Sequence, residues 1–256
     1  MQQQYTVIVT SYECHGLGCQ FLQQNLDSLL QQSYRPLQIV ISDHSRDDKI
    51  EKLVIEKYES VAKRAGIDLV YVRYSDNYGD PCANWNNGAQ YATGDFRHYF
   101  ALDDYFENPD AIADVVKFAN AHDDAQWFAC AHKTDPDQTI FIPRWNDSIL
   151  QHNTLSGPSA VVLRAPNLHS VPFDSTFLWF LDLDWYYRLF LESGRVAPSI
   201  IEKPIWCNRH HAKQLTNTIC CEEQRQKELL ALKRKYGDPL PSNRETDTST
   251  VLPTHQ

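Results

Sequence analysis

The strongest constraint on the fold is an alternation of apolar runs and amphipathic stretches in the first 105 residues. Short runs rich in β-branched and aromatic residues are expected to form strands over 5–10, 37–42, 68–73 and 98–102. Between them, apolar residues recur at helical spacing over 19–32, 47–64 and 84–92. Strands that alternate with helices form parallel sheets with right-handed crossovers. We therefore predict an α/β fold, with a Rossmann-like, mostly parallel sheet flanked by helices.

The second half of the chain is less regular. We expect helices over 109–122 and 182–193, strands over 126–132, 159–164 and 199–208, and a hairpin or long loop over 134–153. A last amphipathic helix is predicted within 219–236, and the Pro-, Ser- and Thr-rich residues 237–256 are expected to be disordered. The expected organisation is one domain over 1–218, with a nucleotide-binding half over 1–105 and an acceptor and catalytic half over 106–218.

Composition excludes several classes of protein. The 256 residues carry 24 basic and 33 acidic side chains, a net charge of −9, which argues against a nucleic-acid binder. No apolar run has the length needed to cross a bilayer. Seven irregularly spaced cysteines and no recognisable leader favour reduced thiols in a cytoplasmic protein. The helix over 222–236 is expected to pack on the core, and peripheral contact with a membrane stays an open alternative.

Polar side chains gather where the predicted strands end. Ser11, Tyr12 and Glu13 follow the first strand, Asp43 follows the second, and Asp103–Asp104 follow the fourth. Ligands of open α/β sheets bind beyond the carboxyl ends of the strands, so these clusters mark a candidate site. Two neighbouring carboxylates there can hold a hard divalent cation, or they can be ordinary solvated acids of a turn. A lone Asp after a strand is usually a cap or turn residue.

Three further candidate positions lie in the second half of the chain. Asp182 opens a predicted helix, where it is either an N-terminal cap or a general base aimed into a cleft. Asp184 lies four residues before Arg188 and can form an ordinary ion pair on the helix surface. Trp145 lies in a polar loop where burial is hard to arrange, so it is the tryptophan expected to be exposed and to bind a sugar.

The motifs in order resemble the inverting glycosyltransferases of family 2, which have the A-type nucleotide-diphospho-sugar transferase fold. The resemblance covers roughly residues 5–218. The similar segments are 7–13 (VIVTSYE), 29–34 (LLQQSY), 39–45 (IVISDHS), 77–79 (NYG), 83–84 (AN), 92–95 (ATGD), 102–109 (LDDYFENP), 157–160 (GPSA), 173–174 (FD), 181–184 (LDLD) with Arg188 and Gly194, and 209–214 (RHHAKQ). His44 departs from the family pattern, which usually has a second acid there.

The resemblance implies a role for each matching position. Asp182 would be the catalytic base, and Asp104 with His211 would hold Mn²⁺ or Mg²⁺. His211 is preferred to His210 because its spacing to Gln214 is the commoner one in the family. The positions implied to bind the nucleotide are Thr10, Ser11, Tyr12, Glu13, Asp43, Asn84 and Asp103. Trp145 and Asp184 are candidate contacts of the donor or acceptor sugar.

The resemblance further implies transfer of a sugar from a nucleotide-diphosphate donor, a UDP-sugar by family habit, to a hydroxyl of a glycan or polysaccharide precursor. Two alternatives remain at this stage. A sugar nucleotidyltransferase would need a glycine-rich, basic phosphate loop after the first strand, and the chain has neither Lys nor Arg over 13–18. A non-catalytic nucleotide-binding module of the same fold would function without Asp182.

Overall fold

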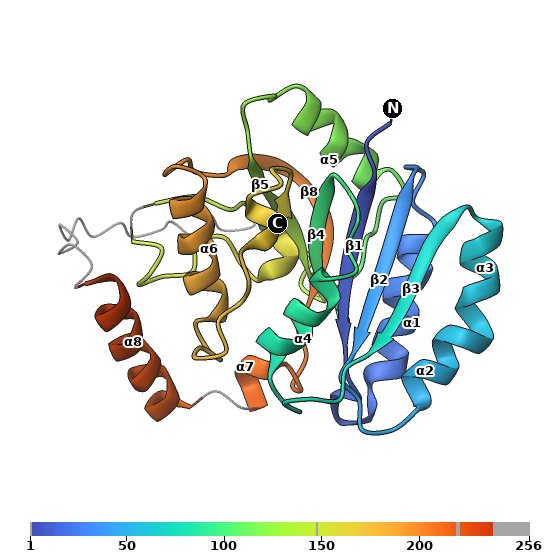
Figure 1. The fold of residues 1–256 in the computed structure, drawn as a ribbon, viewed down its shortest axis with the longest axis horizontal. Helices are drawn as coiled ribbons and strands as arrows, with labels where there is room; N and C mark the ends of the chain where they lie inside the picture. Colours follow the sequence, from blue (N-terminus) through green and yellow to red (C-terminus); the bar gives the residue numbers. More distant parts are fainter. Residues whose placement is uncertain (1, 147, 219–220, 238–256) are drawn as a thin grey trace, which may run out of the picture.

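The computed structural model describes residues 2–146, 148–218 and 221–237, and its fold is shown in Figure 1. Beyond 237, the tail predicted to be disordered lies outside the described residues. One sheet of eight strands runs through the molecule, in the order β3-β2-β1-β4-β7-β5-β6, with β8 paired to β5. The strands are β1 (Tyr5–Ser11), β2 (Leu37–Asp43), β3 (Ile67–Arg73), β4 (Phe96–Ala101), β5 (Trp127–Asp135), β6 (Ile140–Phe141), β7 (Val161–Leu163) and β8 (Ser199–Arg209).

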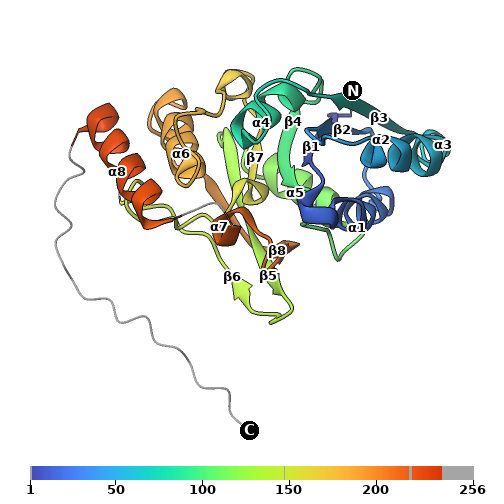
Figure 2. The same cartoon turned by 90° about the horizontal axis from the view of Figure 1, so that it is seen from below.

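Helices lie on both faces of this sheet (Figures 1 and 2). The α-helices are α1 (Gly18–Leu30), α2 (Lys49–Leu53), α3 (Glu59–Arg64), α4 (Pro81–Ala89), α5 (Ala111–Asn120), α6 (Leu181–Glu192), α7 (Leu215–Thr218) and α8 (Glu222–Tyr236). A π-helical segment, η2 (Val54–Tyr58), joins α2 to α3, and short 3-10 turns occupy Cys14–Gly16, Pro158–Ala160 and Leu168–Ser170.

The sheet is mostly parallel, as predicted. β1 pairs in parallel with β2 and β4, β2 with β3, and β5 with β8. The short strand β7 is antiparallel to both of its neighbours, β4 and β5. β7 therefore separates β4 from β5 in the sheet. The sequence pattern did not reveal this antiparallel strand between the two halves of the chain.

Side-chain alternation along the strands divides the interior into two cores. Val7 and Val9 of β1 face α1, α2–α3 and α5, whereas Ile8 between them faces the core beneath α4 and α6. α8 joins this second core through Leu232, which is 2% exposed. The prediction that the last helix packs on the protein is therefore confirmed, although Leu230 on the same helix points outward.

Most predicted elements form within a few residues of their expected limits, and α4 (Pro81–Ala89) begins and ends earlier than predicted. Its predicted range was 84–92, but the helix starts at Pro81. The Asp80 side chain accepts a hydrogen bond from the Ala83 amide, and proline fits the first helical position. The start of α4 is therefore set by a cap and a proline, and Asn84 lies inside the helix.

Within the described residues, no helix combines the length and the apolar character that crossing a membrane requires.

Candidate active site

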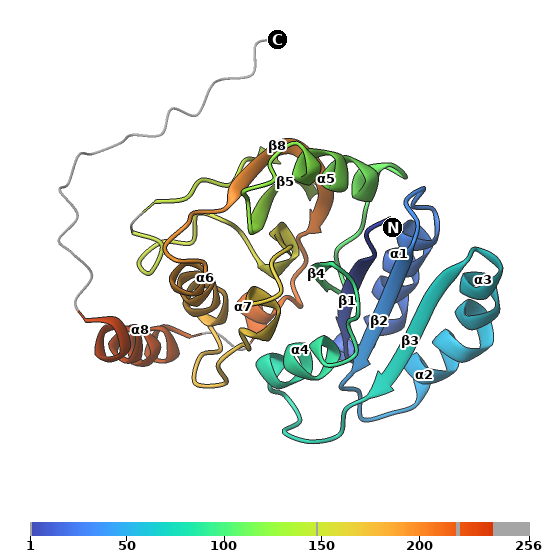
Figure 3. The same cartoon turned by 45° about the horizontal axis from the view of Figure 1, so that its top comes forward.

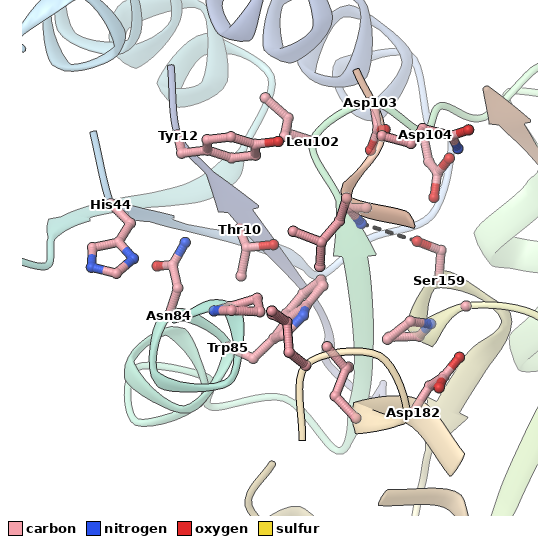
Figure 4. Close-up of a pocket in the computed structure, with 18 of the residues that line it drawn as sticks. Thr10, Tyr12, His44, Asn84, Trp85, Leu102, Asp103, Asp104, Ser159 and Asp182 are labelled. Carbon is pink, nitrogen blue, oxygen red and sulfur yellow. Dashed lines mark hydrogen bonds between the residues drawn. The ribbon is translucent and has the colours of Figure 1, made fainter. Parts of the chain in front are cut away.

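A cavity of about 440 Å³ opens where β1 and β4 end, between the two halves of the chain. Figure 4 shows Tyr12 and His44 on one side of this cavity, Asp103 and Asp104 at the end of β4, and Asp182 on the opposite side. Six of the predicted site residues line it: Thr10, Tyr12, Asn84, Asp103, Asp104 and Asp182. The crossover connections of the sheet bring these residues together from positions up to 172 apart in sequence, since 182 − 10 = 172.

The side of the cavity nearest β1 is held by hydrogen bonds between strand ends and α4. Asn84 donates from its amide nitrogen to the carbonyl of Ser11 (3.2 Å) and accepts from the Ser42 hydroxyl (2.7 Å). Asn84 therefore fixes the ends of β1 and β2 relative to α4. His44 contacts the carbonyl of Asp76 through Nε2 (2.9 Å), and its ring packs against Tyr78.

Asp103 and Asp104 have different surroundings although they are neighbours. Asp103 accepts a hydrogen bond from His211 Nε2 over 2.8 Å. Asp104 is 5% exposed, and its carboxylate accepts from the Arg209 amide at 3.3 Å. Burial, followed by the charge of Asp103, raises the pKa of Asp104 well above its usual value. A buried carboxylate beside a second one is stabilised by any cation that enters the site.

The chemistry of this pair suits a hard divalent cation, because both side chains offer carboxylate oxygens. Across the described part of the chain, no three His, Cys, Asp or Glu side chains are grouped so as to hold a metal ion. His211 is oriented toward Asp103 rather than Asp104, and it does not line the cavity. The protein therefore offers a partial ligand set, which oxygens of a bound diphosphate could complete.

Asp182 lies in the first turn of α6 and faces the cavity from the second half of the chain. Its carboxylate accepts hydrogen bonds from the Leu183 amide (2.9 Å) and from the Asn153 side chain (2.5 Å). Burial raises the pKa of Asp182 to about 7, although the backbone amides act in the opposite direction. A carboxylate with this pKa can accept a proton near neutral pH.

Three predicted nucleotide contacts lie outside the lining of the cavity. Ser11 and Asp43 are fully buried. The Asp43 carboxylate accepts from the hydroxyls of Ser45 (2.6 Å) and Tyr71 (2.7 Å), so its hydrogen-bonding capacity is used within the fold. Glu13 accepts from the Tyr78 hydroxyl (2.5 Å) and thereby ties the loop after β1 to the loop before α4.

Neither candidate sugar contact lines the cavity. The expectation that Trp145 is exposed in a polar loop is wrong, because its ring is partly buried against Trp127 and Phe190 at centroid distances of 5.6 and 4.9 Å. Asp184 is fully buried, and it forms the predicted ion pair with Arg188 at 2.7 Å in the interior rather than on the surface. Both residues stabilise the second core, so we leave them out of the site.

Several residues at the cavity were not assigned a role from the sequence. The Ser159 hydroxyl accepts a hydrogen bond from the Ala101 amide over 3.0 Å (Figure 4). This bond holds the segment over 157–160 against the end of β4. Asn208 and Gln214 reach the cavity from the end of β8 and the turn after it. Ser159 and Gln214 belong to segments that resemble the family, which was the available signal, whereas Asn208 lies just before such a segment. Trp85 and Trp179 also line the cavity, and no pattern in the sequence distinguishes them from core tryptophans.

Comparison with known proteins agrees with this fold. Residues 6–189 match the family model described as Glycosyl transferase family 2. S. aureus TarS 1–349 in complex with UDP-GlcNAc has a similar structure, with 17% identity, a TM-score of 0.68, and coverage of 92% of this chain and 67% of that one. Mannosyltransferase PcManGT from Pyrobaculum calidifontis in complex with GDP-Man and Mn²⁺ has 15% identity, a TM-score of 0.61, and coverage of 94% and 67%.

In another structure of S. aureus TarS, with 17% identity and a TM-score of 0.63, the match takes in 92% of this chain but only 44% of that one. No curated protein matches this sequence. At identities this low, the structural similarity establishes the shared A-type fold and nothing more. The family model, however, matches most of the chain, including the strand ends and the helix that carries Asp182. This chain belongs to glycosyl transferase family 2.

Proposed function

We propose that this protein transfers a sugar from a nucleoside-diphosphate donor, UDP-sugar in the first instance, to a hydroxyl group of a glycan or polysaccharide precursor. The observation that carries the proposal is a single cavity with two chemically different walls. One wall carries the polar strand-end groups around Asp103 and Asp104. The other carries the Asp182 carboxylate, which has a pKa of about 7.

The donor is proposed to bind with its nucleoside near β1. Tyr12 offers an aromatic face, and Thr10, His44 and Asn84 supply polar atoms along the same wall. UDP is the first nucleotide to test because S. aureus TarS was solved with UDP-GlcNAc and with UDP. PcManGT was solved with GDP-Man, so GDP is the second.

Metal dependence is supported by the charges of the cavity. Among the described residues that line it, three are aspartates and none is Lys or Arg. A diphosphate carries negative charge, and with no Lys or Arg in the lining to offset that charge, its binding beside these aspartates is unfavourable unless a cation compensates. Mn²⁺ or Mg²⁺ held by Asp104, with Asp103 and His211 nearby, would supply charge neutralisation for the departing nucleoside diphosphate.

Asp182 is proposed to act as the general base. Its carboxylate would accept the proton of an acceptor hydroxyl as that oxygen attacks the anomeric carbon and the bond to the diphosphate breaks. Attack from the side opposite the leaving group is a single displacement, so the configuration of the anomeric carbon inverts. Asn153 and the Leu183 amide orient the carboxylate for this task. Since only the ionised form accepts a proton, turnover should rise with pH through about 7.

The acceptor, its pathway and the site of action are further parts of the proposal. The family resemblance favours polysaccharide biosynthesis in the cytoplasm, with a glycan or polysaccharide precursor as acceptor and peripheral association at a membrane as part of the proposal. The sugar nucleotidyltransferase alternative is not supported, because the loop over 13–18 contains neither Lys nor Arg.

Calorimetric titration of UDP with and without Mn²⁺ tests the donor site. Wild type should bind UDP in a metal-dependent manner, Asp104→Asn should lose that dependence, and the exposed Asp137→Asn should behave as wild type. Turnover of UDP-sugars is then compared between wild type and Asp182→Asn. Donor binding with a loss of turnover of about 100-fold or more supports the base. Failure of wild type to bind any nucleoside diphosphate would refute the transferase proposal. Turnover in Asp182→Asn equal to that of wild type would refute the base, and donor binding without turnover in wild type would favour a non-catalytic module.

A further inference from the structure

Helix α8 places a buried carboxylate at the start of the helix that carries Asp182. Glu228 is 1% exposed, although it belongs to a helix rich in charged residues. Its two carboxylate oxygens accept hydrogen bonds from three consecutive backbone amides, those of Leu178 (2.9 Å), Trp179 (2.8 Å) and Phe180 (2.9 Å). Gln224, one turn earlier on α8, donates to the same carboxylate over 2.5 Å.

This arrangement holds the turn that leads into α6. The first amides of an α-helix have no partner within the helix, and α6 has no side-chain cap at its N-cap residue, Phe180. Negative charge is favoured at that end of the helix. A carboxylate that accepts from backbone amides forms charge-assisted bonds, which are stronger than neutral ones. Glu228 therefore holds the turn over 178–180 and satisfies the amide of the N-cap residue Phe180, which lies 48 residues earlier in the sequence.

A second set of contacts joins the same two helices. Near the end of α8, Lys235 Nζ contacts Asp184 at 2.8 Å and Asp174 at 2.6 Å, and the Tyr236 hydroxyl donates to Asp184 over 2.6 Å. Asp184 lies in the first turn of α6 and is fully buried. α8 is thus bound to the start of α6 at two points, and Figure 3 shows the two helices in the part of the molecule opposite α2 and α3.

The segment held by Glu228 is part of the cavity wall. Leu178 and Trp179 line the cavity, and Asp182 follows Phe180 by two residues. We propose that Glu228 is a positioning residue of the glycosyltransferase reaction, which sets the segment over 178–180 and, through it, the orientation of the Asp182 carboxylate. This proposal rests on the proposed function. It also assigns a role to α8, which lies beyond the residues that match the family model, 6–189.

Charge acts in the same direction as position. The groups that face Asp182 are Asn153 from the preceding loop, Tyr186 from the next turn of α6, and Glu228 from α8. Burial is the largest cause of the raised pKa of Asp182, and the negative charge of the Glu228 side chain raises this pKa further. Removing that charge should lower this pKa and so move the acid limb of the pH–rate profile to lower pH.

The test compares Glu228→Gln with Glu223→Gln, a control that makes the same charge change at an exposed position of α8. Glutamine keeps one acceptor but turns an NH₂ group toward the amides, so fewer than three bonds can form. Hydrogen exchange should show loss of protection at residues 178–180 in Glu228→Gln alone. We expect kcat to fall about 10- to 100-fold with UDP affinity within about twofold of wild type, and the acid limb to shift downward.

A second variant separates position from charge. Glu228→Asp keeps the charge but is one methylene shorter, so kcat should fall while the acid limb stays near its wild-type position. If Glu228→Gln does not fold, Glu228→Asp still tests whether Glu228 positions Asp182. Loss of amide protection with unchanged kcat and an unchanged pH profile would overturn the positioning role. Absence of turnover in wild type would instead refute the proposed function, whereas the exchange experiment would still report whether Glu228 holds the segment.

Discussion

Replacing Asp182 by Asn should make the protein more stable while it removes most of the turnover. The Asp182 carboxylate has an ordinary pKa of 3.8 in the unfolded chain and about 7 in the folded one, because folding buries it. Between these two values the unfolded chain has the ionised form and the folded chain holds the proton. The folding stability that the Asp182 carboxyl contributes is therefore fully present below about pH 4. This contribution is lost as the pH rises from about 4 through 7.

The size of the effect follows from the two pKa values. Each pH unit between them costs about 1.4 kcal/mol of unfolding free energy, so the total approaches about 4 kcal/mol. Asparagine keeps the shape and the acceptor oxygen but does not ionise. Between pH 5 and pH 8, the stability of Asp182→Asn relative to wild type should therefore increase by about 2–3 kcal/mol. For a chain of this size, that corresponds to an additional rise in Tm of about 5–10 °C.

Urea unfolding of both proteins at pH 5, 6, 7 and 8 measures this difference. The exposed Asp137→Asn variant is the control, since it removes a carboxylate that folding leaves in water. Its stability difference from wild type should not change with pH. A constant difference between wild type and Asp182→Asn over the same range would show that Asp182 is ionised throughout, and our account of the base would then be wrong.

Three further results are expected. In wild type, kcat should rise with pH to a plateau above about 7, and steady-state turnover at saturating substrate checks this. Asp184→Asn leaves Arg188 and Lys235 without their buried partner, so the unfolding free energy should drop by about 3 kcal/mol, as measured in urea. In Gly18→Ala, the new Cβ would lie 2.2 Å from the carbonyl oxygen of Tyr12. The backbone must move, and calorimetry should show UDP affinity reduced about tenfold or more, with a loss of about 1–3 kcal/mol in stability.

The first half of the fold could be predicted because its signals are local. Runs such as 37–42 have consecutive apolar, β-branched residues at their centre (Ile39, Val40 and Ile41), which is typical of strands buried on both faces. The chain order of strands and helices then restricts the topology, because crossovers between parallel strands are right-handed. The location of Asp103 and Asp104 at a strand end followed from the same pattern, and the structure places both at the cavity.

Predictions that depended on the surroundings of a side chain were less successful. Trp145 was expected to be exposed because its neighbours in sequence are polar, yet Trp127 and Phe190 cover its ring from other elements. Asp43 lies at a strand end like Asp103, but Tyr71 and Ser45 occupy its carboxylate. Position along a strand indicates which end a residue occupies. It does not indicate whether neighbouring strands supply partners for that side chain.

The sequence by itself determined the α/β class, the mostly parallel sheet, the edge of the sheet where polar groups gather, and the resemblance that identified Asp182 as a candidate base. These follow from hydrophobic periodicity and from the order of motifs, both of which are properties of short segments. Only the tertiary structure decided that Asp182 is buried enough to have a pKa near 7, and that Glu228 holds the turn before its helix, 48 residues from Phe180. The pKa depends on desolvation and the turn depends on hydrogen bonds between distant segments, and both exist only once the chain has packed.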